Sequence, residues 1–187
     1  MGTIKTWKLA FVRDGNIYVS NGDGSEQKLL INNAESPSWS PDREQIAFAR
    51  NNNMWVARVD GTGQGPLTFK WKKRHQDSWY RDIYISWHPR DGFITFSHED
   101  EFRVDRLGGI KGITYKSNHP KGVVAGSSLF DVAVSGPEAK KVVVRYDLYE
   151  NGTGFHFSDH SHPAWSKSGK KLDFTRNGDI VIVHPPP

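Results

Sequence analysis

The sequence contains no cysteine, which excludes disulfide bonds, a thiolate nucleophile and metal sites with sulfur ligands. It has no uninterrupted apolar run near the roughly 18 residues that a membrane-spanning helix needs. The opening residues, MGTIKTWKLAF, lack the apolar core of a signal peptide. Amphipathic helical windows are also missing. These absences predict a chain that does not cross a membrane and is built from strands.

A strong excess of charge of one sign is absent too. Lys and Arg total 25 against 21 Asp and Glu, a formal net charge of +4. This mild basic balance favours acidic partners, but it is too small by itself to indicate nucleic acid.

Glycine and proline are abundant, with 18 Gly and 10 Pro, and they fall mainly between short apolar runs. Two apolar runs separated by a polar or Gly-containing break are typical of a β-hairpin. Five segments share this pattern: KLAFVRDGNIYVS (8–20), QIAFARNNNMWVA (45–57), GFITFSHEDEFRV (92–104), KVVVRYDLYENGTGFHF (141–157) and KLDFTRNGDIVIV (171–183).

A second pattern precedes most of these hairpins and contains a tryptophan. It reads SPSWSPDRE at 36–44, YISWHPRDG at 84–92 and HPAWSKSGK at 162–170, with DVAVSGPEA at 131–139 as a looser fit without the tryptophan. A repeat of roughly 40 to 50 residues with four strands in each unit indicates a β-propeller. We expect each tryptophan to lie on the innermost strand and to pack against the neighbouring blade.

The stretch SPSWSPDREQIAFAR, followed by MWVARVDGTGQGPLTF, resembles the repeat of TolB-like propellers (WD40-like, PD40-type). Three features depart from that repeat. Arg43 replaces the usual glycine, Lys167 and Ser168 replace Pro-Asp, and the unit around 129–157 is degenerate. The resemblance implies the fold and says little about function, because one fold hosts many functions.

We therefore predict an all-β chain that forms a single β-propeller domain over 1–187. About five four-stranded blades, some of them incomplete, are expected, and the alternative is part of a larger propeller. The expected repeat units are 7–35, 36–82, 83–128, 129–161 and 162–187.

Strands that reverse direction at every turn place alternate connections on opposite faces of a propeller. Loops 68–82, 117–128 and 157–162 then share one face with residues such as His98. Long loops on a rigid scaffold are where binding residues usually lie, so we expect this face to be the functional surface.

The loop FKWKKRHQDSWYRD (69–82) interleaves aromatic and cationic residues, a composition that suits an acidic peptide or an anionic glycan. Single-stranded nucleic acid is a disfavoured alternative, and a solvated loop capping the blade is another. The candidate ligand-binding residues are Trp71, Arg74, His75, Trp79, Tyr80 and His119.

Three histidines, His156, His160 and His162, suggest a divalent metal site, since alternate residues of an extended segment point the same way. Residues 160–163 are similar to an H-x-H-P segment of oligogalacturonate lyases, which implies metal-holding histidines, although Phe157 stands where a glutamine ligand is expected. The alternative is a polar loop with local hydrogen bonds. No other cofactor is expected.

No catalytic set such as a G-x-S-x-G elbow is present. The favoured function is a non-catalytic module that binds a protein segment or glycan on the face carrying loops 68–82, 117–128 and 157–162. The alternative is a metal-dependent polysaccharide lyase or hydrolase, and a propeller whose catalytic domain lies outside this chain also stays open. We expect a periplasmic or secreted location, with the export signal removed from this sequence.

Overall fold

The computed structural model describes residues 7, 9–68, 80–90, 92–104, 122–133, 142–146, 160–176 and 178–184. For strand residues 80, 99–104, 122–128, 130–133, 142–146 and 160, only the backbone is described. All regular structure in this part of the chain is β-strand. It contains no helix of the length and apolarity that a membrane span requires.

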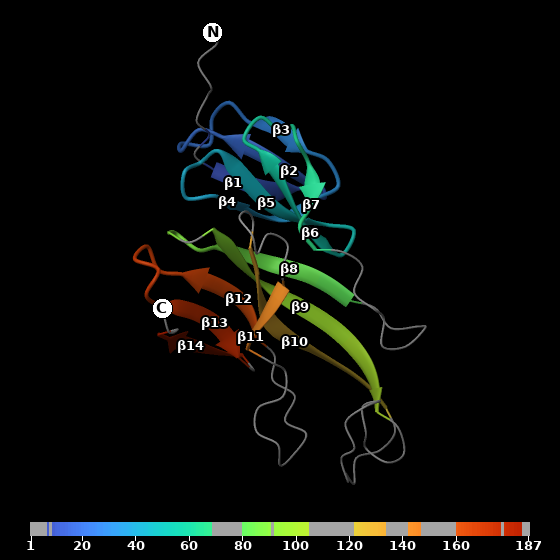
Figure 1. The fold of residues 1–187 in the computed structure, drawn as a ribbon. Helices are drawn as coiled ribbons and strands as arrows, with labels where there is room; N and C mark the ends of the chain where they lie inside the picture. The colour runs from blue at the N-terminus through green and yellow to red at the C-terminus, as the bar shows by residue number, and fades with distance from the viewer. Residues whose placement is uncertain are drawn as a thin grey trace.

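The strands form four antiparallel sheets, which we call blades 1 to 4 (Figure 1). Blade 1 contains β1 (Leu9–Arg13), β2 (Asn16–Ser20) and β3 (Lys28–Ile31). Blade 2 contains β4 (Glu35–Trp39), β5 (Gln45–Arg50), β6 (Asn53–Arg58) and β7 (Gly65–Pro66). Blade 3 contains β8 (Tyr80–Trp87), β9 (Phe93–Val104), β10 (Gly122–Ala133) and β11 (Val142–Tyr146). Blade 4 contains β12 (His160–Trp165), β13 (Leu172–Arg176) and β14 (Asp179–Val183).

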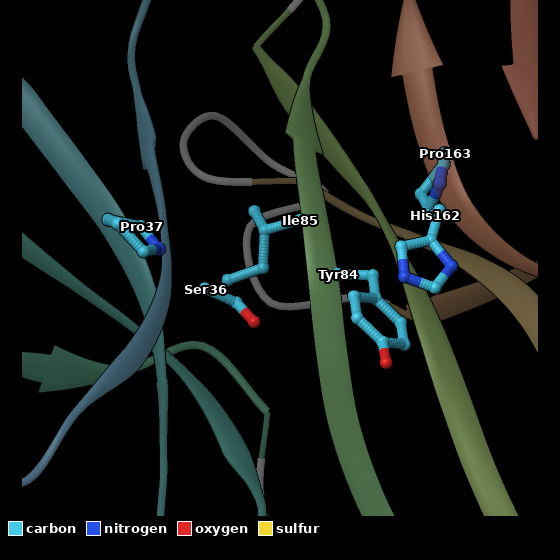
Figure 2. Close-up of a pocket in the computed structure, with 6 residues that line it drawn as sticks. All are labelled: Ser36, Pro37, Tyr84, Ile85, His162 and Pro163. Carbon is cyan, nitrogen blue, oxygen red and sulfur yellow. The ribbon is translucent and has the colours of Figure 1, made fainter. Parts of the chain in front are cut away.

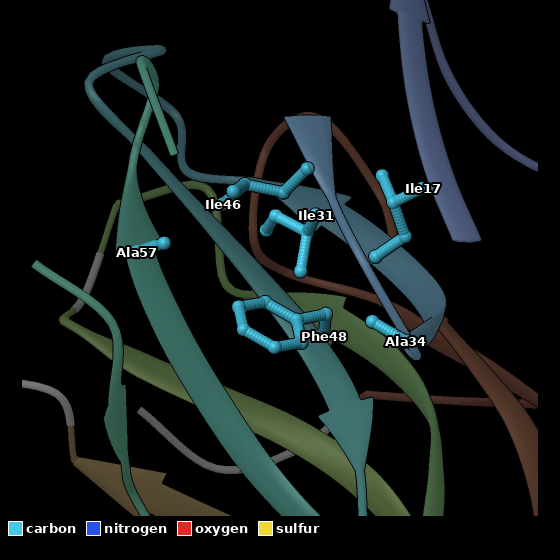
Figure 3. Packing of buried hydrophobic residues seen from close by; sticks show 6 residues of the cluster. All are labelled: Ile17, Ile31, Ala34, Ile46, Phe48 and Ala57. Atoms are coloured by element: carbon cyan, nitrogen blue, oxygen red, sulfur yellow. The ribbon is translucent and has the colours of Figure 1, made fainter. Parts of the chain in front are cut away.

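Three apolar cores lie between consecutive blades. The first joins blades 1 and 2 and contains Ile17, Ile31, Ala34, Ile46, Phe48 and Ala57 (Figure 3). The second joins blades 2 and 3 and contains Ala47, Met54, Leu67, Ile94 and Phe96. The third joins blades 3 and 4 and contains Leu129, Leu172 and Phe174. Because side chains alternate along a strand, Ile46 and Phe48 face blade 1 while Ala47 faces blade 3.

This series of sheets packed against one another is the arrangement predicted for the blades of a propeller. The described residues form four sheets, so a separate blade at 129–161 is not present among them. Strand β10 crosses the expected boundary at 128/129 and pairs along its full length with β9, from Gly122 opposite Val104 to Ala133 opposite Phe93. The repeat is degenerate there because β10 and β11 complete blade 3 instead of starting a new unit.

Blades 1 and 2 repeat the same hydrogen bonds at the same interval along the chain. Arg13 donates from Nη1 to Oε1 of Gln27 at 2.8 Å, and Arg50 donates from Nη1 to Oε1 of Gln64 at 2.6 Å. Aromatic pairs stack at equivalent positions, Phe11 on Tyr18 in blade 1 and Phe48 on Trp55 in blade 2. The periodicity in the sequence thus corresponds to a repeated structure.

The turn after β6 shows why Asp-Gly pairs close these hairpins. Asp60 Oδ1 accepts hydrogen bonds from the Thr62 hydroxyl at 2.6 Å and the Thr62 amide at 2.9 Å. Gly61 then adopts a left-handed φ of 84°, which glycine reaches without steric cost. The Thr62 hydroxyl, followed by its amide, lowers the pKa of Asp60 below its ordinary value of 3.8.

Each tryptophan of the repeated pattern ends the first strand of its blade and packs towards the preceding blade. Trp39 borders the first core, Trp87 the second and Trp165 the third. Trp165 also bonds to blade 3, since its Nε1 donates to Oγ1 of Thr95 at 2.9 Å. This confirms the predicted role of the tryptophans in blade-to-blade packing.

Candidate functional site

The first strands of blades 2, 3 and 4 share a β-bulge. In β4, the four residues from Glu35 to Ser38 lie opposite three residues of β5, from Ala47 to Ala49, so β4 contains one extra residue. The same register shift occurs in β8 between Ile83 and Ser86 and in β12 between Ser161 and Ala164.

A residue with left-handed backbone marks each bulge. The φ angles are 51° at Ser36, 53° at Tyr84 and 53° at His162. A positive φ is uncommon for residues other than glycine, and backbone strain of this kind often accompanies functional sites. The three residues occupy equivalent positions, each three residues before the tryptophan of its blade.

The bulges converge on one pocket with a volume of about 250 Å³. Its lining consists of two consecutive residues from each bulge: Ser36, Pro37, Tyr84, Ile85, His162 and Pro163 (Figure 2). Figure 2 shows Ile85 directed from β8 towards Ser36 and Pro37, and Tyr84 directed towards His162. A bulge changes the direction of the side chains relative to a regular strand. Here the three bulges place side chains from three blades around one pocket.

An aromatic stack forms one side of the pocket. The rings of Tyr84 and His162 lie with centroids 3.6 Å apart and planes inclined by 30°. Nδ1 of His162 is 3.0 Å from the hydroxyl of Ser161, which fixes the orientation of the imidazole. His162 is exposed and Tyr84 is half-buried, so the stack borders both solvent and the pocket.

The chemistry of the lining is apolar with a few neutral hydrogen-bonding groups. Pro37, Ile85 and Pro163 supply apolar surface, and the phenol, the imidazole and one serine hydroxyl supply polar atoms. The six lining residues include no carboxylate, amine or guanidinium. A concave apolar site with a small number of polar groups is typical of ligand recognition.

A buried polar cluster forms around Asp82, nearer the start of β8 than the pocket residues. Asp82 is fully buried, and its Oδ1 lies 2.6 Å from Nδ1 of His98 while its Oδ2 accepts from the Thr68 hydroxyl at 2.6 Å. The Thr68 hydroxyl oxygen also accepts from the amide of Met54. Buried polar groups need hydrogen-bond partners. Because Asp82 finds one of its partners in Thr68, the cluster holds blade 3 against blade 2. His98, which was expected on the functional face, is buried and contacts Asp82.

Most of the predicted ligand-binding residues lie outside the described part of the structure: Trp71, Arg74, His75, Trp79 and His119. Tyr80 is described only as a strand position, at the start of β8 opposite Asp100. These residues remain predictions.

The predicted metal site is described at one of its three histidines. His156 lies outside the described residues, and His160 is described only by its backbone, opposite Arg176. The segment is not uniformly extended, since His162 has a φ of 53° within the bulge, and the simple alternation expected for an H-x-H pair does not hold there. No group of three or more metal-ligating side chains occurs among the described residues. The metal site stays a prediction.

Sequence reasoning singled out His162 but missed the other five lining residues. A signal was present, because each pair occupies the two positions that begin the patterns SPSW, YISW and HPAW. Each bulge forms in the pairing of the first strand of a blade with the strand that follows it, however, and a single sequence does not reveal the register of that pairing.

Comparisons with known proteins support the fold. No family model matches the sequence, and no curated protein matches it. Among solved structures, a chain from the complex of nidogen with laminin aligns with a TM-score of 0.53 and 12% identity, covering 91% of this chain and 51% of that one. A protein assigned as TolB from Agrobacterium tumefaciens aligns with a TM-score of 0.52 and 18% identity, covering 95% of this chain and 54% of that one.

These similarities show the β-propeller fold, including the resemblance to TolB inferred from the repeat. The chain spans about half the length of each of these two solved chains.

Proposed function

We propose that this chain is a non-catalytic binding module that holds a segment of another protein in the pocket formed by the three bulges. The observation that carries the proposal is the convergence of three equivalent bulges on one small, uncharged site. Apolar walls suit an apolar side chain of an extended segment. The phenol of Tyr84 and the hydroxyl of Ser36 suit the backbone amides and carbonyls beside it.

Two further points support a protein ligand. One of the similar structures is a complex of nidogen with laminin, so a chain of this fold is found there together with a protein partner. His162 also ends the loop 157–162 predicted to lie on the functional face, so the predicted aromatic and basic loop residues would extend the same surface. An acidic glycan is the competing ligand, and its recognition would depend on those loop cations more than on the uncharged pocket.

The test selects ligands from a phage-displayed library of random linear peptides and, in parallel, from a glycan array. Tyr84→Asn and His162→Asn remove the stacked rings, and asparagine tolerates the left-handed backbone that both positions require. Selected peptides should lose about tenfold or more in affinity for either variant, as expected when roughly 1.4 kcal/mol of contact is removed.

Arg43→Asn provides the matched control, since it places asparagine at another left-handed position, with a φ of 64°, that does not line the pocket. It should bind the selected peptides as the unaltered chain does. The proposal is wrong if only glycans bind, or if peptide affinity is the same for all three variants.

A further inference from the structure

The terminal blades expose residues at positions that are buried in the other blades. Ile180 and Ile182 in β14 are 80% and 58% exposed, the most exposed of the large apolar residues in the described part of the chain. Leu9 in β1 is 45% exposed. Large exposed apolar residues that cluster on one surface mark interaction sites.

The internal repeat identifies what each of these positions does elsewhere. Leu9 stands four residues before Arg13 at the hairpin turn, as Ile46 stands four residues before Arg50. Ile46, and likewise Leu172 at this position in blade 4, are fully buried against the preceding blade. Leu9 therefore belongs to a surface that normally receives a preceding blade.

The isoleucines of β14 belong to the opposite surface. Ile180 directly follows the turn residue Asp179, as Met54 follows Asn53 in blade 2. Met54 is fully buried in the core shared with the next blade. Ile180 therefore belongs to a surface that normally receives a following blade.

Cross-strand neighbours extend both surfaces. In blade 1 the front face carries Leu9, Phe11, Tyr18 and Leu29, because Phe11 lies opposite Tyr18 and Tyr18 opposite Leu29. In blade 4 the back face carries Asp173, Thr175, Ile180 and Ile182, because Asp173 lies opposite Ile182 and Thr175 opposite Ile180. Each face is one half of the contact that already forms between consecutive blades within the chain.

We propose that these two faces pack against each other between two copies of this chain, with blade 4 of one copy against blade 1 of the next. The chain carries both halves of the contact, so the back face of one copy is complementary to the front face of another. The faces also differ in charge. Arg13 flanks the front face, with its guanidinium 4.0 Å from the Tyr18 ring centroid, and Asp173 lies on the back face. Opposite charges favour front-to-back contact, and two front faces would bring the Arg13 side chains together.

Such a contact is heterologous: each copy uses one face and leaves the other available. Sedimentation velocity of the chain at increasing concentration should therefore show a mass that rises through a dimer to larger species. Leu9→Lys should abolish this association because it places a charge on the front face. Ile180→Glu should abolish it because it places a charge on the back face. Each variant alone should sediment as a monomer.

Mixing the two variants gives the decisive measurement. Leu9→Lys keeps an intact back face and Ile180→Glu keeps an intact front face, so an equimolar mixture should form a one-to-one dimer and nothing larger. Val12→Lys is the control, because Val12 is also 45% exposed and lies on β1, but on the face turned to blade 2, opposite Ile17. It should associate like the unaltered chain.

Circular dichroism and thermal unfolding show whether all variants keep the fold, which is expected because the substituted side chains are exposed. A chain that stays monomeric at every concentration overturns the proposal. So does a mixture that fails to dimerise, or a single variant that still forms dimers, which would indicate a symmetric contact between like faces.

Discussion

Two constraints act on Gly169, a left-handed backbone and a close contact with the neighbouring blade. It lies in the turn after β12 with a φ of 71°, and a Cβ at this position would approach the His88 imidazole of blade 3 to 2.8 Å. His88 cannot move away easily, since its ring stacks on Phe93 with a centroid distance of 4.6 Å and meets the edge of Trp165 at 4.4 Å. Its Nε2 lies 3.2 Å from the carbonyl oxygen of Gly169.

Gly169→Ala should lower the free energy of unfolding more than Gly178→Ala. Both residues have a positive φ, so each substitution costs about 1–2 kcal/mol for left-handed backbone. Gly178 has open space around its Cβ position, and only Gly169→Ala adds the displacement of His88. Urea unfolding of the two variants measures the difference, and equal losses would contradict the packing described for His88.

Two residues show how far single positions can be predicted. The sequence marked Arg43 as standing where the repeat has glycine, and Arg43 indeed adopts a φ of 64°, close to the 71° of Gly169 at the equivalent turn position. The sequence contains no comparable signal for the left-handed backbone of Tyr84. Its left-handed backbone arises from the bulge in β8, which depends on pairing with β9 and not on the preference of a tyrosine.

Individual strands derive their stability from the neighbours on both of their faces. Phe48 in β5 is fully buried in the core between blades 1 and 2, whereas Phe11 in β1, at the same repeat position, is only half-buried on the front face of blade 1. The two phenylalanines also stack on equivalent partners, Trp55 and Tyr18. They form a matched pair that differs in whether a preceding blade covers them.

Phe48→Ala should therefore destabilise the chain by about 3–5 kcal/mol, the usual cost of removing a buried phenylalanine. Phe11→Ala should cost less than half as much under conditions in which the chain is monomeric. Chemical denaturation at low protein concentration tests this comparison, and similar losses would show that Phe11 is as well packed as Phe48.

Most strands could be predicted from the sequence because their apolar runs and turn residues agree. The hairpins expected at 8–20, 45–57 and 171–183 correspond to β1–β2, β5–β6 and β13–β14. The segment 92–104 was also expected to form a hairpin, but it contains the single strand β9. Of the hairpin expected at 141–157 only β11 is described, and it pairs with β10. Apolar runs show that a strand forms, but the length of the strand and the partner it pairs with depend on the rest of the sheet.

At the scale of the molecule, each blade of the described chain packs on its neighbours in sequence. Stability in such architectures is approximately a sum of the units and of the contacts between adjacent units. Blades 2 and 3 have cores on both sides, whereas blades 1 and 4 each have one described core. The ends should therefore open more readily than the middle.

Hydrogen exchange followed by mass spectrometry should show the slowest amide exchange in β5, β6 and β9, and faster exchange in β1 and β14. Under conditions where copies associate, protection of β1 and β14 should rise. Uniform protection across all four blades would instead indicate a single cooperative unit.

The fold class could be predicted from the repeat, since the tryptophan pattern and paired apolar runs recur along the chain. The number of blades could not, because the unit that lacks a tryptophan continues an existing sheet. The pocket could not be predicted either, because it forms only when three bulges from distant segments of the chain lie side by side.

The bulges have a consequence for how this scaffold can change. Ser36, Tyr84 and His162 differ from one another, while each is followed three residues later by the same tryptophan. None of the three belongs to the cores that hold the blades together. New specificities can therefore arise, by selection or by engineering, through exchanges at these three positions for residues that accept the same backbone, while the architecture that presents them is left intact.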